Sequence, residues 1–191
     1  MLLVQGLKFK VMVIMSNKEF RVIGSGRHVR LIDNNGWEYV ERVNGYRVVC
    51  MVPVTDDNHI ILVEQYRVPI RRVVIELPAG LVGDIPKQEN EPLAQAAQRE
   101  LVEETGYEAG EMIYLTEGPP SSGLSNEIIT FFLAKGLKKV GPGGGDASEN
   151  ISVHEVPLSE APCWIEKMCR EKNMMADPKI YLGLYFAGMR R

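Results

Sequence analysis

The chain has 191 residues, a net charge of −3 at pH 7, and 45% hydrophobic and 25% charged residues. This mixture is typical of a globular protein with one domain, or one domain and a small appendage. The charge argues against a dedicated nucleic-acid-binding protein, and no apolar stretch reaches the roughly 18–20 residues of a membrane span. Three cysteines without zinc-ligand spacing indicate reduced thiols, so we expect a cytoplasmic protein.

Residues 1–45 predict strands joined by turns. Apolar side chains alternate over 9–13, which is the period of a strand. The turn sequence Asn34-Asn35-Gly36 separates two apolar runs, 29–32 and 37–40, as in a hairpin. We therefore expect an antiparallel β-sheet subdomain over 1–45.

The remainder, 46–191, predicts further strands, then one strong helix, then strands and two more helices, an α+β order. A polar loop is expected from Gly80 to Asn90, and a mobile Gly/Pro-rich loop at 141–145. The expected strands are 46–54, 60–63, 73–77, 112–115, 127–134 and 151–156, and the late helices are 158–172 and 177–190.

The strong helix is predicted to open at Glu91-Pro92, with proline early in the first turn and an acidic residue near the positive end of the helix dipole. Gly106 is predicted to end it. The buried stripe recurs at every fourth residue: Leu93, Ala97 and Leu101.

Three carboxylates share one face of this helix, because Glu100, Glu103 and Glu104 stand at i, i+3 and i+4. A solvated acidic face is the ordinary meaning of such a cluster. Two features weigh against it here: like charges at this spacing repel, and the helix dipole disfavours anions near the C-terminal end. A hard cation explains the cluster better, since carboxylate oxygens suit Mg²⁺ or Mn²⁺.

The segment from Glu91 to Tyr107 resembles the second half of the Nudix box, G-x5-E-x7-R-E-U-x-E-E-x-G-U, where U is a bulky apolar residue. The first half departs from the pattern, because ten residues rather than five separate Gly80 from Glu91. We interpret this as a five-residue insertion within 84–90 that leaves the helix register intact. The resemblance implies a Nudix hydrolase with an α/β/α sandwich and a mixed sheet over 46–191.

Other segments are similar to the branch that hydrolyses ADP-ribose and nucleoside-diphosphate sugars. Glu76-Leu77-Pro78-Ala79-Gly80 resembles its E-L-P-A-G entry, in which the carbonyl of the alanine, here Ala79, also binds metal. Glu64-Gln65-Tyr66-Arg67 resembles its E-Q-Y-R segment, which implies that Arg67 contacts the diphosphate. A surface arginine at a strand end is the alternative for Arg67.

Ser122, Gly123 and Leu124 lie where this branch has its P-G-x-S-D-E substrate loop. A proline sixteen residues after the box glycine accompanies ADP-ribose preference, and Ser122 stands at that position here. The resemblance thus implies ADP-ribose first and other nucleoside-diphosphate sugars next.

The implied reaction is hydrolysis of a diphosphate bond, giving a nucleoside monophosphate and a sugar phosphate. Glu100, Glu103 and Glu104, with the Ala79 carbonyl, would hold Mg²⁺, with Mn²⁺ as an alternative ion. A carboxylate outside the helix must accept the proton of the attacking water. Glu149 is the first candidate for this catalytic base and Asp146 the second, and loop carboxylates in water are the alternative for both.

Arg99 could contact phosphate, but the family pattern favours an ion pair with Glu91 that orients the ligand helix. Trp37, Glu38 and Arg42 match a short W-E-x-x-x-R segment that binds adenine across a homodimer interface in related enzymes. Ordinary sheet packing is the alternative for Trp37.

Three other functions compete with this prediction. One is a pyrophosphatase for other nucleotide sugars or nucleotides, and another is a Nudix domain that senses a nucleotide without hydrolysing it. The complete glutamate set argues against a sensor. A role on RNA would need a basic groove, which the composition does not suggest. The expected partner is a small nucleotide-sugar substrate, not nucleic acid or a membrane.

Overall fold

The computed structural model describes residues 20–44, 47–85, 90–145 and 149–189. A strand that is buried on both faces lies at the centre of the fold. This strand, β4 (Arg47–Pro53), pairs in parallel with β10 (Ile129–Lys135). Central strands of this kind are apolar on both faces. Side chains of β4 alternate between two hydrophobic clusters, with Val48, Cys50 and Val52 in one and Val49 and Met51 in the other.

The described part of this body contains two four-stranded sheets and one strand pair, and β4 belongs to the first sheet. The first sheet has the order β7-β4-β10-β9, with β7 at Ala79–Val82 and β9 at Glu111–Gly118. The second has the order β12-β5-β6-β13, with strands at Ser152–Pro157, His59–Arg67, Arg72–Glu76 and Met175–Ala176. Both sheets mix parallel and antiparallel pairs. The small pair is β8 (Tyr107–Glu108) with β11 (Lys138–Lys139).

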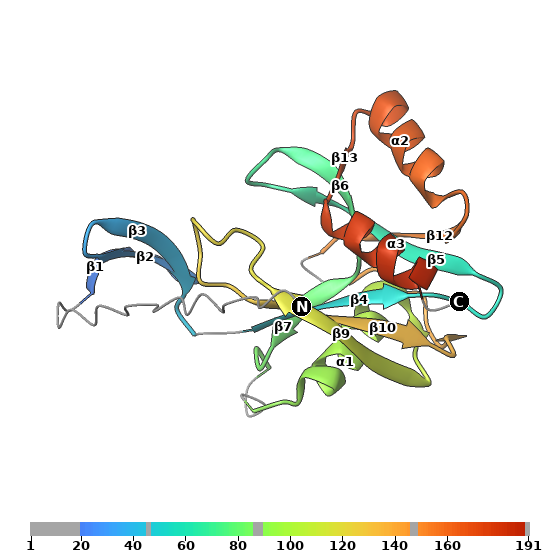
Figure 1. The fold of residues 1–191 in the computed structure, drawn as a ribbon, viewed down its shortest axis with the longest axis horizontal. Coiled ribbons are helices and arrows are strands. Elements are labelled where there is room, and N and C mark those ends of the chain that lie inside the picture. Colours follow the sequence, from blue (N-terminus) through green and yellow to red (C-terminus); the bar gives the residue numbers. More distant parts are fainter. Residues whose placement is uncertain (1–19, 45–46, 86–89, 146–148, 190–191) are drawn as a thin grey trace, which may run out of the picture.

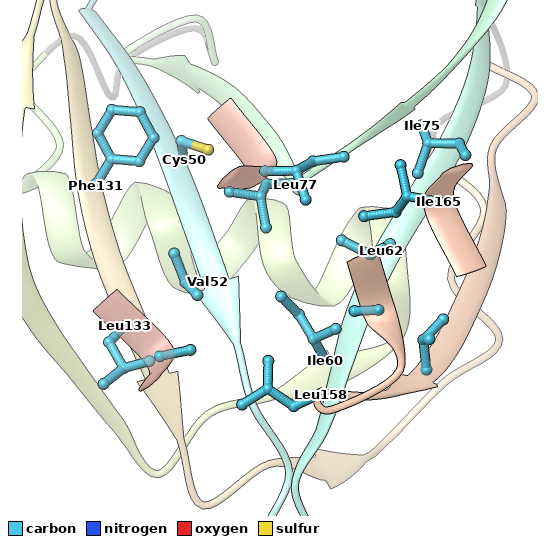
Figure 2. Close-up of a cluster of buried hydrophobic side chains, with 14 of the residues drawn as sticks. Cys50, Val52, Ile60, Leu62, Ile75, Leu77, Phe131, Leu133, Leu158 and Ile165 are labelled. Carbon is cyan, nitrogen blue, oxygen red and sulfur yellow. The ribbon is translucent and has the colours of Figure 1, made fainter. Parts of the chain in front are cut away.

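In the described part of the chain, three helices cover the sheets from opposite sides (Figure 1). α1 (Leu93–Thr105) buries Ala96, Ala97 and Leu101 against the Val49–Met51 side of β4. α2 (Ala161–Lys172) and α3 (Lys179–Met189) pack on the other side, in the cluster that joins the two sheets (Figure 2). The predicted α+β class with mixed sheets is confirmed.

A separate three-stranded antiparallel sheet precedes this body and extends from one end of it (Figure 1). Its strands are β1 (Arg21–Ser25), β2 (Val29–Asn34) and β3 (Trp37–Arg42). The predicted hairpin is present: Asn35 and Gly36 both have positive φ, 58° and 86°, as a tight turn between twisted strands requires. The N-terminal antiparallel sheet is therefore confirmed for the described residues.

Two predicted boundaries were wrong. The expected loop after Gly80 begins as strand, because β7 continues the E-L-P-A-G segment and pairs with β4. Helix α1 begins at Leu93, and Pro92 is its N-cap rather than part of the first turn. The strand expected at 9–13 lies outside the described residues, and the second base candidate, Asp146, does too.

Candidate active site

A cavity of about 560 Å³ lies where β7, α1 and the β5–β6 pair meet. Many of the predicted site residues line it together: Arg42, Arg67, Ala79, Arg99, Glu100, Glu103, Glu104 and Glu149. The lining also contains four charged residues that were not predicted as site residues: Glu76, Asp84, Glu127 and Lys179. Among the described residues, the cavity thus combines seven carboxylates with four cationic side chains.

Helix α1 places two of the carboxylates almost out of solvent. Glu100 and Glu104 keep 8% and 3% of their surface exposed. A Cβ on Gly80 would lie 1.9 Å from Cδ of Glu100, so only glycine leaves room for this carboxylate against β7. The backbone N–H of Ala79 donates to Oε2 of Glu104 at 3.1 Å. The E-L-P-A-G segment therefore positions two side chains of the helix.

Burial disfavours the ionised form of both carboxyl groups. It raises the pKa of Glu104 to about 9, assisted by the charges of Glu100 and Glu149 and opposed by the Ala79 N–H. Burial also raises the pKa of Glu100 to about 7, opposed mainly by the charge of Arg99. Carboxylates in such a site hold protons at neutral pH unless another cation replaces them.

The residues present fit a divalent metal ion. The donor set consists of oxygen atoms, which are the ligands that Mg²⁺ and Mn²⁺ prefer. A divalent cation would supply the positive charge that Glu100 and Glu104 lack in their buried environment. Glu103 stands on the same helix face and its side chain keeps 38% exposure, so it reaches the open part of the cavity.

Arg99 is the centre of an ion-pair network behind the carboxylates. Its guanidinium donates to both oxygens of Glu91 at 3.2 and 3.1 Å, to Glu100 at 2.6 Å and to the carbonyl of Leu81 at 3.0 Å. Burial alone would lower the pKa of Arg99, but the hydrogen bonds to Glu91 and the charge of Glu100 raise it. The predicted pair with Glu91 is confirmed, and Arg99 holds Glu100 as well.

A second cationic group faces the carboxylates from the β5–β6 pair. Arg67 donates through Nε to Glu76 at 2.8 Å, and its side chain keeps 42% exposure. Burial raises the pKa of Glu76, and Arg67 opposes this shift. Lys179, the first residue of α3, lines the same side of the cavity and pairs with Asp177.

Arg42 and Glu127 form the boundary between this cavity and a second one of about 560 Å³, because both residues line both cavities. They form an ion pair at 2.7 Å. The second cavity lies between the N-terminal sheet and residues 125–128. The backbone N–H of Val40 donates to the carbonyl of Leu124 at 2.8 Å, which fixes the end of β3 beside this segment.

Arg42 lies on the wall of its own chain's cavity, because β3 runs alongside residues 124–125. Its predicted role across a dimer interface stays a prediction. Trp37 and Glu38, at the far end of β3, line neither cavity, and Trp37 is 63% exposed. Ser122, Gly123 and Leu124 are exposed and also lie outside both linings.

Another group of potential metal ligands lies away from the cavity. Ligand atoms of Asp57, His59 and Glu155 all lie within 4.8 Å of one another. Glu155 also accepts a hydrogen bond from the hydroxyl of Tyr107 at 2.8 Å. None of these four residues lines the carboxylate cavity.

The comparison with known families agrees with this geometry. Residues 45–175 match the model of the NUDIX domain. The chain belongs to the Nudix family. The carboxylate helix, the Gly80 contact and the Arg99–Glu91 pair all lie within the matched residues.

Several characterised proteins are similar to this Nudix chain. It is 36% identical over 152 residues to the methanol dehydrogenase activator of Bacillus methanolicus, which covers 76% of this chain and 80% of that protein. It is 37% identical over 114 residues to the ADP-ribose pyrophosphatase of Bacillus subtilis (strain 168), 59% of each chain. It is 33% identical over 137 residues to the GDP-mannose pyrophosphatase of Citrobacter koseri, 68% of each chain.

A crystal structure described as an ADP compounds hydrolase matches the fold with a TM-score of 0.60 and 25% identity. The match covers 78% of this chain and 80% of that one. Together with relatives named pyrophosphatases, it confirms the prediction of a Nudix hydrolase. The chain spans less than two thirds of the Bacillus ADP-ribose pyrophosphatase. Among the described residues, no helix is long and apolar enough to cross a membrane.

Glu127 and Lys179 escaped the sequence analysis for different reasons. Glu127 belongs to the segment similar to P-G-x-S-D-E, in which only the earlier residues Ser122, Gly123 and Leu124 were predicted to bind substrate. Lys179 lies beyond the residues that match the family and has no motif around it. Only the packing of α3 against β4 and the Leu77 side chain brings it to the cavity.

The raised pKa of Glu104 predicts an unusual pH dependence of stability in the metal-free protein. Between the unfolded pKa of 4.5 and the folded value of about 9, the folded state binds more protons than the unfolded state. The free energy of unfolding should therefore fall as pH rises from 7 to 9, by at most about 1.4 kcal/mol per pH unit for one proton.

Urea unfolding in the presence of a chelator measures this slope. Glu104→Gln should remove most of it and raise stability at pH 9, whereas Glu166→Gln on the exposed face of α2 should retain it. Saturating Mg²⁺ should flatten the slope in the unmodified protein, since metal and proton compete for the carboxylate. A slope unchanged by Glu104→Gln would contradict the conclusion that burial raises the pKa of Glu104.

Proposed function

We propose that this Nudix hydrolase cleaves the diphosphate bond of ADP-ribose or a related nucleoside-diphosphate sugar with the help of Mg²⁺. The products are a nucleoside monophosphate and a sugar phosphate. The observation that carries the proposal is the cavity in which buried glutamates of α1 face Arg67 and Lys179. The named activities of the similar pyrophosphatases support it.

Each group around the cavity has a distinct task in this proposal. Glu100, Glu103, Glu104 and the Ala79 carbonyl would hold the cation, which when bound neutralises the diphosphate and activates water. Arg67 and Lys179 bind phosphate oxygens on the opposite wall, where a guanidinium offers a planar pair of donors. Glu149 accepts the proton of the attacking water at its carboxylate.

The second cavity gives the substrate room beyond the diphosphate. A nucleoside-diphosphate sugar has two bulky ends, and the two adjoining cavities meet at the Arg42–Glu127 pair. One end of the substrate would pass this pair and contact the N-terminal sheet. The exposed segment of Ser122, Gly123 and Leu124 would then influence which sugar or base is accepted.

We also propose that residues 1–45 form a dimerisation subdomain and that 46–191 form the Nudix domain. The N-terminal sheet exposes apolar side chains beside an edge strand, and such surfaces are normally covered. These side chains are Phe20, Val22, Ile23, Val29 and Trp37. A second copy of the chain would cover them, and Trp37 and Glu38 would then serve the site of the second subunit.

The substrate proposal is tested by phosphate release from a panel of nucleotide sugars and nucleotides with Mg²⁺, coupled to phosphatase. Glu103→Gln and Glu104→Gln should each lower kcat by at least about 100-fold, because each removes charge from a ligand of the cation. Glu166→Gln serves as the surface control. Binding of ADP-ribose without hydrolysis of any panel member would favour a nucleotide sensor instead.

A second candidate function follows from the relative named a methanol dehydrogenase activator, which this chain matches over most of both lengths. In this alternative, the chain raises the activity of an oxidoreductase. The rate of methanol oxidation by a methanol dehydrogenase, with and without the chain, measures the effect. Stimulation lost in Glu104→Gln would tie it to the carboxylate cavity, and no stimulation would dismiss the candidate.

Mixing variant proteins tests the dimer and the origin of each site residue. If Trp37 serves the partner, mixing Trp37→Ala with Glu104→Gln leaves one intact site in each mixed dimer. Random pairing makes about half the dimers mixed, so activity should recover to about a quarter of that of the unmodified protein. Mixing Arg42→Ala with Glu104→Gln is the matched control and should give no recovery, because both residues line one chain's cavity.

Native mass spectrometry confirms subunit exchange in both mixtures. Recovery in neither mixture would remove Trp37 from the partner's site, and a monomeric mass would refute the dimer itself.

A further inference from the structure

The Gly-rich segment 141–145 is bonded to the end of helix α1 rather than extending as a free loop. A helix leaves its last backbone carbonyls without partners inside the helix. The N–H of Gly144 donates to the carbonyl of Glu104 at 2.8 Å, and the N–H of Gly145 donates to that of Glu103 at 3.1 Å. The segment therefore satisfies the carbonyls of two residues whose side chains line the carboxylate cavity.

Backbone packs directly on backbone at this contact. Gly143 has φ +71°, and a Cβ there would lie 2.5 Å from the carbonyl carbon of Thr105. Gly106, which ends the helix, has φ +71°, and its Cβ would lie 2.2 Å from the carbonyl oxygen of Gly141. Side chains do not fit between the two segments, so glycine is required at 106 and 143 for geometric reasons.

The same segment leads to Glu149. Past this residue, the N–H of Ile151 donates to the carbonyl of Gly144 at 3.2 Å, and the Ile151 side chain is buried. A Cβ on Gly145 would lie 2.4 Å from Oε2 of Glu149, which shows how closely this carboxylate lies against the segment. Backbone hydrogen bonds therefore hold Gly145, before Glu149, and Ile151, after it, close to the end of α1.

From these contacts we infer that Gly143, Gly144 and Gly145 form a positioning segment, which fixes Glu149 relative to the glutamates of α1. The inference rests on the proposed function, in which Glu149 accepts a proton from water near those glutamates. Gly143 acts through Glu149 and does not itself touch substrate. Its role is to keep the segment close enough to α1 for the two backbone hydrogen bonds to form.

The test compares Gly143→Ala with Gly141→Ala. A Cβ at Gly141 meets no atom within 4 Å, so this variant is the matched control and should behave like the unmodified protein. Gly143→Ala should lower kcat on the best substrate of the panel at least about tenfold with KM changed less than about twofold, since a misplacement of 1 Å costs about 100-fold. Loss of substrate affinity with unchanged kcat would overturn the inference.

A double-mutant cycle separates positioning of Glu149 from general damage. In a Glu149→Gln background, Gly143→Ala should reduce kcat by less than about twofold further, because the group that it positions is already disabled. Independent, multiplying losses would mean that the segment acts through the helix glutamates alone, and would refute the inference.

Amide exchange provides a readout that needs no substrate. The N–H groups of Gly144 and Gly145 should exchange slowly in the unmodified protein and in Gly141→Ala, and quickly in Gly143→Ala, with an unchanged core. Equal exchange in all three would overturn the inference even if the protein hydrolyses nothing. Absence of hydrolysis with the expected exchange pattern would instead refute the proposed function alone.

If Gly143→Ala does not fold, Gly145→Ala replaces it. Gly145 has φ +79°, so alanine strains the backbone there. The nearest atom to its Cβ is the carboxylate oxygen of Glu149, so the variant also displaces that side chain, while the contact at Gly143 gains no side chain. It should show the same fall in kcat and the same lack of further effect in Glu149→Gln. Normal kcat in Gly145→Ala would refute the positioning of Glu149.

Discussion

Two carboxylates, Glu100 and Glu104, are buried one helical turn apart near the C-terminal end of α1, where both the helix dipole and their mutual repulsion oppose negative charge. The neighbouring structure offsets this cost in specific ways. Arg99 neutralises one side, the Ala79 N–H donates to Glu104, and Gly80 leaves space for Glu100. The offset is incomplete, as the raised pKa of both groups shows. Binding of a cation would therefore stabilise a site of this kind.

The cationic side chains lie on two sides of the buried carboxylates and have different partners. Arg99 lies behind the carboxylates and is committed to Glu91 and Glu100, so it has few donors left for a ligand. Arg67 and Lys179 lie on the open side, where each shares its charge with one carboxylate and remains partly exposed. An anionic ligand would therefore be bound from one wall by the metal and from the other by Arg67 and Lys179.

Much of the site was predictable because its spacing is local. Glu100, Glu103 and Glu104 share a face by helical periodicity, and Arg99 pairs with Glu91 only eight residues before it. The turn at Asn35-Gly36 was equally local. Glu127 and Lys179 were missed because chain segments far apart in sequence bring them to the cavity, and no short motif records such a contact. The strand character of β7 was missed because glycine and alanine carry little strand propensity, and pairing with β4 decides it.

The Arg42–Glu127 pair has a consequence for turnover. It is half-buried and stands where the two cavities meet, so a ligand that occupies both would compete with it for hydrogen bonds. While an intact substrate spans the boundary, its own polar groups would replace the partners that the pair loses. After cleavage, each half is shorter and offers fewer such groups, and an unpaired charge in this place is costly. Re-formation of the ion pair would then favour departure of the two products.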